Sequence, residues 1–282
     1  MRTPAALLRA VQTAGESLLS RANGPEGAFR QEEVLREAGY RPWPLPREPW
    51  SMGQIWSDLL FAHWSFPADA IERLVPPELP LDTYEGRAWI GVVPFRIESL
   101  RLRGTPALLG LSSFAEINVR TYVTVNGRPG VYFFSLDAAT WRAVLAARGT
   151  YRLPYFRSGI EAGRSDGKLY FCSRRISLGR AAVTFAAEYG PVGDPLPIVE
   201  GSLERWLAER YCLYTVDRQR RVYRGEIHHP PWPLYRAWAD LTENTMTAPL
   251  GLRLEGDPLL HFSARQDAAL WPIHRVVSDE LS

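Results

Sequence analysis

Residues 115–125 alternate strictly between two kinds of side chain, and this limits what the chain can fold into. A period of two with many β-branched residues predicts a β-strand. One face carries Ile117, Val119, Thr121, Val123 and Val125, and the other carries Glu116, Asn118, Arg120, Tyr122 and Thr124. The Asn126-Gly127 pair then supplies the positive φ angles of a tight hairpin. A partner strand over 130–137 is therefore expected.

The polar face of this strand has two interpretations. Solvent-exposed strand faces are common, but they usually carry Lys, Glu, Thr and Ser instead of a Glu-Asn-Arg-Tyr series. In a closed barrel or cone, polar residues can face an enclosed cavity while the aliphatic face packs on outer helices. The pattern alone leaves both interpretations open.

The order of motifs along the chain resembles that of the acetoacetate decarboxylase-like superfamily, and the full set resembles its YqjF-like branch, a family of unknown function. The motifs are LLFAHW (59–64), GRAWIGVVPF (86–95), NVRTYV (118–123), GVYFFSLDA (130–138), LPYF (153–156), ERYCLYTV (209–216), HHPPWPL (228–234) and HFS (261–263). The resemblance implies a β-rich α+β fold, a closed β cone or barrel with a central cavity and helices packed outside.

Two regions follow from the extent of this resemblance. Residues 1–49 are expected to form an N-terminal helical extension with a Pro-rich linker, and 50–282 the acetoacetate decarboxylase-like β-cone domain. Trp43 and Trp50 favour packing of the linker on the domain. We expect residues 1–45 to lie outside the cone, so that their deletion leaves a folded core.

The local patterns also predict the other elements. Strands are expected over 55–64, 87–98, 168–177, 181–189, 211–217, 221–229, 258–265 and 268–277. Helices are expected over 4–21, 31–38, 67–75, 138–148, 202–210 and 233–241, with a loop over 190–201. Ser202 is a favourable N-cap for the helix that follows it.

One departure from the resemblance affects the chemistry. In the decarboxylases a catalytic lysine follows the proline of the motif after the helix and forms a Schiff base, whereas here Tyr155 follows Pro154. The only lysine, Lys168, follows a Ser-Asp-Gly turn, where water surrounds it. Because a Schiff-base lysine must be desolvated to lower its pKa, this chemistry is not expected.

The candidate site residues lie on the polar strand face and beside it. Glu116 is predicted to act as acid or base, because burial can raise the pKa of a carboxyl group. Tyr155 would donate a hydrogen bond to a carbonyl oxygen, and the guanidinium of Arg120 would bind a carboxylate with two donors. The remaining predicted substrate-binding residues are Asn118, Tyr122, Tyr132 and His228.

Three functions fit these residues. The first is an enzyme acting on a small organic acid or carbonyl compound without a Schiff-base lysine. The second is a non-catalytic ligand-binding or sensing module. The third is a purely structural barrel in which Glu116 and Arg120 satisfy each other. Their Cα atoms should be roughly 13 Å apart along one strand, which favours a ligand between them.

Composition and motif spacing exclude several other classes. A net charge of +2 does not indicate a nucleic-acid partner. The five histidines lack metal-binding spacing, so no metal and no cofactor are predicted. No apolar run is long enough to span a membrane, and no signal peptide is evident, so we expect a cytoplasmic protein. The expected partner is a small-molecule ligand, and a homo-oligomer is left open.

Overall fold

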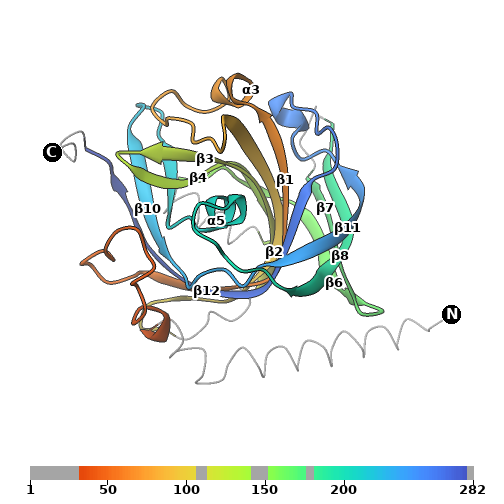
Figure 1. The fold of residues 1–282 in the computed structure, drawn as a ribbon, viewed down its shortest axis with the longest axis horizontal. Coiled ribbons are helices and arrows are strands. Elements are labelled where there is room, and N and C mark those ends of the chain that lie inside the picture. Colours follow the sequence, from red (N-terminus) through yellow and green to blue (C-terminus); the bar gives the residue numbers. More distant parts are fainter. Residues whose placement is uncertain (1–31, 106–112, 141–151, 176–180, 278–282) are drawn as a thin grey trace.

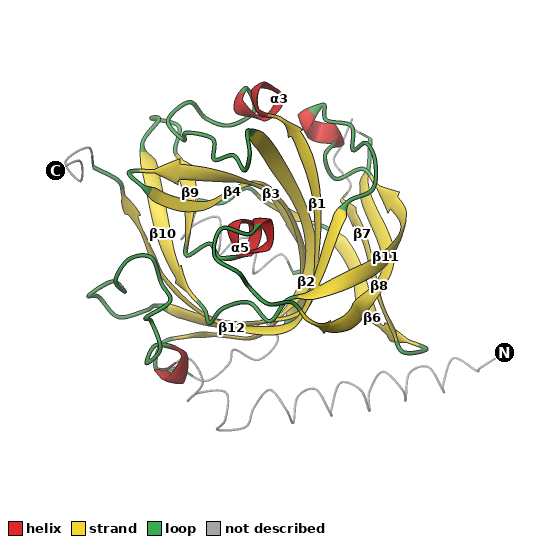
Figure 2. Cartoon of the chain, viewed as in Figure 1, coloured by secondary structure: helices red, strands yellow, loops and turns green. Residues whose placement is uncertain are grey.

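A computed structural model describes residues 32–105, 113–140, 152–175 and 181–277, and strands dominate it (Figures 1 and 2). The strands are β1 Met52–Pro67, β2 Arg87–Leu102, β3 Phe114–Val125, β4 Arg128–Ala138, β5 Tyr155–Arg157, β6 Gly159–Ser165, β7 Lys168–Arg175, β8 Val183–Pro195, β9 Cys212–Val216, β10 Val222–His228, β11 Tyr235–Asn244 and β12 Leu259–Arg275. The helical elements are α3 Ala68–Glu72, α5 Leu203–Ala208 and the 3₁₀ helix η1 Ala248–Leu250.

Hydrogen bonding closes part of the sheet into a ring. The strands β1-β2-β3-β4-β9-β10-β12 are neighbours in that order, and pairing of β1 with β12 closes it. We call these strands the ring. The strands β11-β8-β7-β6 continue from β12 as a second layer, the outer sheet. The predicted closed, β-rich fold is therefore confirmed, although the ring with its outer sheet is not a simple barrel.

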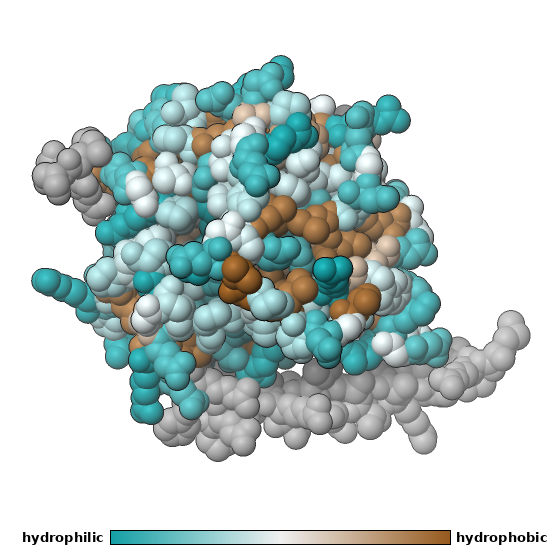
Figure 3. All heavy atoms as spheres, viewed as in Figure 1, coloured by the Kyte–Doolittle hydropathy of each residue, from teal (hydrophilic) through white to brown (hydrophobic). Residues whose placement is uncertain are grey.

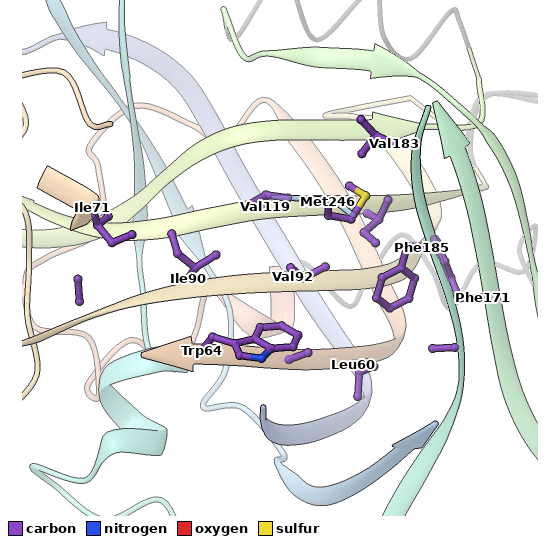
Figure 4. Packing of buried hydrophobic residues seen from close by; sticks show 14 of the residues in the cluster. Leu60, Trp64, Ile71, Ile90, Val92, Val119, Phe171, Val183, Phe185 and Met246 are labelled. Carbon is purple, nitrogen blue, oxygen red and sulfur yellow. The ribbon is translucent and has the colours of Figure 1, made fainter. Parts of the chain in front are cut away.

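The largest hydrophobic core lies between the ring and the outer sheet. Val119 of β3 and Val92 of β2 are fully buried there, in one cluster with Phe171 of β7 and Phe185 of β8 (Figure 4). The aliphatic face of β3 therefore packs as predicted against another layer. That layer is a sheet, however, and not the outer helices that we expected.

Helix α5 covers one end of the ring. It begins after Ser202, whose Oγ accepts a hydrogen bond from the backbone amide of Arg205 at 3.2 Å, so the predicted N-cap is confirmed. Leu207 is buried among the side chains inside the ring. In Figure 1 this helix lies within the outline of the ring, and Figure 3 shows atoms filling this end.

Most predicted strands are present, but three elements differ. The predicted helix 233–241 is wrong, because this segment is strand β11, whose pairing with β8 overrides the helix propensity of its Ala and Leu residues. The predicted loop 190–201 is wrong in its first half, because β8 continues to Pro195. The two C-terminal strands are one strand, β12.

Among the described residues, the helices are shorter than predicted. Helix 67–75 is reduced to α3, which follows Pro67 and ends at Glu72. The predicted helix 4–21 lies outside the described residues, as does most of 138–148. Of the segment 31–38, residues 32–34 are helical.

The described part of the N-terminal segment packs on the ring through Arg41 and two tryptophans. The side chain of Arg41 is fully buried, forms an ion pair with Glu226, and donates to the backbone carbonyl of Tyr211 at 3.3 Å. Trp43 donates to the same carboxylate at 2.8 Å, and Trp50 is buried against β12. The deletion proposed from sequence should therefore end before Arg41.

Replacing Arg41 tests the importance of this contact. Arg41→Met should lower the free energy of unfolding by about 3 kcal/mol, because it removes one partner of a buried ion pair. This loss of stability should be smaller than if the Glu226 carboxylate were left without a partner, because Arg128 and Arg224 also form ion pairs with it. Urea denaturation of the full chain would measure it. Arg73→Met, which removes an exposed ion pair, is the matched control and should change stability by less than about 1 kcal/mol.

The outer surface is mainly hydrophilic on the face seen in Figure 3, with hydrophobic side chains gathered toward the outer sheet. None of the helices among the described residues has the length and apolar character needed to cross a membrane.

Candidate functional site

The ring encloses a cavity of about 610 Å³. Its walls are mostly aliphatic and aromatic, which is typical of sites for small organic ligands. A few polar residues interrupt them: Ser51, Gln54, Glu116, Asn118, Arg120, Tyr155, Arg210 and His229. Four of the seven residues predicted from the sequence thus line one cavity, namely Glu116, Asn118, Arg120 and Tyr155.

The register of β2 and β3 orders these residues along the cavity. Arg120 pairs with Gly91, Asn118 with Val93, and Glu116 with Phe95. Phe114 follows, and the cavity continues along β2 to Leu102, which is 49% exposed. We call the part around Arg120 and Arg210 the arginine end, and the part around Leu100, Leu102 and Phe114 the open end.

Gly91 makes room for the arginine end. A Cβ atom at this position would lie 2.9 Å from His63 Nε2 and 3.3 Å from Arg120 Cγ. Any larger residue would therefore displace His63 or the stem of Arg120. This close approach explains the glycine within the strand motif that faces β3.

Two guanidinium groups face the arginine end. Those of Arg120 and Arg210 lie 5.8 Å and 4.8 Å from the ring centroid of Tyr122. Arg210 pairs with Asp82 at 2.6 Å, yet one of its terminal nitrogens is buried without a hydrogen-bond partner. Among the described residues, no carboxylate forms an ion pair with Arg120, and its Nε is buried and unpartnered. This end of the cavity thus carries an excess of positive charge.

The field of Arg120 reaches a neighbouring histidine. His63 is buried, and its Nε2 lies 2.6 Å from the hydroxyl of Tyr122. Burial lowers the pKa of His63 well below its usual value, and the charge of Arg120 lowers it further. His63 therefore stays neutral and adds no positive charge to this end of the cavity.

Glu116 lies nearer the middle of the cavity and is bound to Tyr155. The Tyr155 hydroxyl donates to Glu116 Oε2 at 2.9 Å. Burial raises the pKa of Glu116 to about 8; the Tyr155 hydrogen bond opposes this rise and the charge of Asp137 adds to it. Glu116 is therefore mostly protonated at neutral pH, with a pKa in the range useful for acid–base catalysis.

The other three predicted residues do not line the cavity. Tyr122 lies on the correct face of β3, but Trp206 of α5 covers it at a ring distance of 4.8 Å. Tyr132 points the other way, because it pairs with Thr121 while its neighbour Phe133 pairs with Arg120 and lines the cavity. These placements correct the prediction that Tyr122 and Tyr132 line the site.

His228 is also placed outside the cavity. Ile227 lines the cavity, so the next residue of β10 points outward. The His228 ring stacks on Tyr40 of the N-terminal segment at 5.8 Å, and its Nε2 lies 3.0 Å from the carbonyl oxygen of Val34. Both His228 and His229 are buried, and His229 is the one that lines the cavity.

Four polar residues of the cavity were missed from sequence, namely Ser51, Gln54, Arg210 and His229. Arg210 follows α5 and His229 follows β10, and neither belongs to an alternating pattern that indicates its direction. His229 Nε2 lies 3.3 Å from the carbonyl oxygen of Arg210, so the two positions are linked. The only signal was their inclusion in the ERYCLYTV and HHPPWPL motifs.

Lys168 does not line the cavity. It begins β7 of the outer sheet, its side chain is 55% exposed, and its Nζ lies 3.3 Å from Glu188. Tyr155 takes the place after Pro154, at the start of β5. Within the described residues, no group of three His, Cys, Asp or Glu side chains is arranged to hold a metal ion.

A closed ring of strands around a mostly apolar cavity with a few polar residues defines the class of the protein, which has an acetoacetate decarboxylase-like fold. The crystal structure of acetoacetate decarboxylase from Legionella pneumophila matches with a TM-score of 0.56 and 14% identity, over 86% of this chain and 95% of that chain. The enduracididine biosynthesis enzyme MppR complexed with pyruvate matches with a TM-score of 0.57 and 14% identity, over 86% and 95%.

Comparison of amino-acid sequences shows the family to which the chain belongs. The family model DUF2071, described as an uncharacterized conserved protein, matches residues 53–267, and the chain belongs to this family. The uncharacterized protein YqjF of Bacillus subtilis (strain 168) is 44% identical over 232 residues, which cover 82% of this chain and 95% of YqjF. The YqjF-like resemblance expected from the motifs is therefore confirmed.

Proposed function

We propose that the cavity binds a small organic acid or carbonyl compound and that the protein acts on it by proton transfer, without a Schiff base. The observation that carries the proposal is the Arg120 side chain, which lines an apolar cavity without an ion-pair partner among the described residues. A guanidinium against apolar walls attracts an anion more strongly than one in water does, because the effective dielectric constant is lower there. A carboxylate fits, because a guanidinium binds it with two parallel hydrogen bonds.

Glu116 is the proposed acid–base group. Its pKa of about 8 leaves both protonation states accessible near neutral pH. Removal of a proton from the carbon beside a carbonyl group, and its return, would need one such carboxyl within reach. Tyr155 holds Glu116 through its hydroxyl. It can donate to a ligand carbonyl, as expected from sequence, only by releasing this hydrogen bond.

A proton-exchange experiment tests this proposal. The protein would be incubated with 2-oxohexanoate in D₂O, and the proton signal at C3 followed by NMR. We expect wild-type protein to speed its loss, and Glu116→Gln to abolish this while leaving the ligand bound. Binding without exchange would indicate the alternative, a non-catalytic binding or sensing module. Absence of binding would contradict the proposal and favour a structural barrel.

The absence of Schiff-base chemistry is tested separately. Treatment with borohydride in the presence of pyruvate or acetoacetate should leave the mass of the protein unchanged, because Lys168 is exposed and outside the cavity. Intact-mass spectrometry with peptide mapping would measure this. A stable adduct on Lys168 would contradict this part of the proposal.

A further inference from the structure

The cavity is much larger than the polar head group that its arginine end can bind. Its volume of about 610 Å³ falls in the range of sites for drug-sized ligands. A two- or three-carbon acid held by Arg120 would leave most of this space unfilled. The chemical character of the remaining walls therefore indicates the character of the rest of the ligand.

The charged groups and most of the apolar walls are separated along the cavity. Arg120 and Arg210 lie at one end, and Asn118 and Glu116 follow along β3. Beyond Glu116 the lining residues of β2 and β3 are all apolar: Ile97, Leu100, Leu102 and Phe114. Met52 and Leu153 add further apolar surface to the lining, while Ser51 and Gln54, next to Met52, are the uncharged polar residues at this end. The exposure of Leu102 identifies this side as the open end.

We infer that the ligand is an amphiphilic acid, with a carboxylate at the arginine end and an apolar chain or ring that extends past Glu116 toward the open end. This inference rests on the proposed function and names its substrate class. The guanidinium groups of Arg120 and Arg210, which line the cavity, supply the donors for the head group. The apolar walls supply the affinity for the tail, because each buried methylene contributes to binding through the hydrophobic effect.

This orientation also places the group on which Glu116 acts. Glu116 and Arg120 are four residues apart on one strand face, so their Cα atoms are about 13 Å apart. The reacting carbon therefore lies between the carboxylate and the tail, near Asn118. The side-chain amide of Asn118 lines the cavity here and is the polar group available to a hydroxyl or enol group.

A chain-length series tests the inference directly. Butyrate, hexanoate, octanoate and the neutral analogue octan-1-ol would be titrated into the full-length protein by calorimetry at pH 7. The affinity should rise about fourfold for each added methylene, which corresponds to about 0.8 kcal/mol. Octanoate should therefore bind about 200-fold more tightly than butyrate, and octan-1-ol should bind much more weakly than octanoate.

The outcomes separate this inference from the proposed function. Equal affinity for butyrate and octanoate would overturn the inference and leave acid binding intact. No binding of any acid would overturn both. Binding of octan-1-ol as tight as that of octanoate would show an apolar site without a carboxylate head group, which also overturns both.

Variants locate the tail. Phe114→Ala should weaken octanoate binding at least fivefold and leave butyrate binding unchanged. Phe134→Ala is the matched control, because Phe134 is also partly buried but packs on the outer side of β4. If Phe114→Ala fails to fold, Leu102→Glu at the exposed rim of the open end replaces it, with the same expectation. Loss of butyrate and octanoate binding by the same factor would contradict the proposed position of the tail.

Discussion

Arg120→Met should weaken the binding of octanoate by about 100-fold or more and change the stability of the protein by less than about 1 kcal/mol. Truncating one partner of a buried charge pair typically costs several kcal/mol of binding free energy. Stability should be preserved because, among the described residues, Arg120 forms no ion pair, and its guanidinium lies over the rings of Phe61 and Tyr122. A methionine side chain can fill the same apolar surroundings.

Calorimetric titration and urea denaturation of the same samples measure the two effects. Arg174→Met is the control, since Arg174 is exposed on the outer sheet and should leave both quantities unchanged. Unaltered acid binding by Arg120→Met would mean that the head group binds elsewhere. A loss of several kcal/mol of stability would instead support a structural role for Arg120.

Glu116→Gln should make the protein more stable than the wild type at pH 8.5 by about 5 kcal/mol, with a much smaller difference at pH 5. The pKa of Glu116 is raised from 4.5 to about 8 in the folded protein. Between these values the folded state holds a proton that the unfolded state has lost, so wild-type stability falls as the pH rises. Each pH unit in this window costs about 1.4 kcal/mol. Glutamine stays neutral and can still accept from Tyr155.

Urea denaturation at both pH values would measure this effect. Glu188→Gln, which changes an exposed carboxylate of the outer sheet, is the control. Its free energy of unfolding should differ from that of the wild type by the same small amount at pH 5 and pH 8.5. Burial raises the pKa of Asp137 to about 6. The stability of the wild type and that of Glu116→Gln therefore both fall by a similar amount as the pH rises toward 6, and this effect cancels in the comparison. If the pH dependence of Glu116→Gln equals that of the wild type, Glu116 is not a protonated, buried acid.

The sequence predicted the site where a strand is regular and failed where pairing is irregular. On β3 the alternation alone placed Glu116, Asn118 and Arg120 on one face, because period two is a property of the strand itself. On β4 a bulge adds Phe134 between the partners of Val119 and Arg120. Without it Arg120 would pair with Phe134, and Tyr132 would lie on the cavity side. A bulge depends on both strands, so one strand pattern does not reveal it.

Long-range pairing explains the other differences between the prediction and the structure. The residues of β11 have helical propensity, yet β8 pairs with them along most of their length. The direction of Arg210 depends on how α5 ends against the ring, where Arg210 Nε donates to the carbonyl of Trp206 at 2.6 Å. The hairpin at Asn126-Gly127 was predictable, because its positive φ angles are a local property of this residue pair.

A crystal structure of the protein grown with octanoate tests the central claim most directly. We predict density for the acid inside the ring, with its carboxylate within hydrogen-bond distance of Arg120 and Arg210 and its tail past Glu116 toward Leu102. Density only outside the ring, or a cavity filled by a direct contact between the side chains of Arg120 and Glu116, would contradict it.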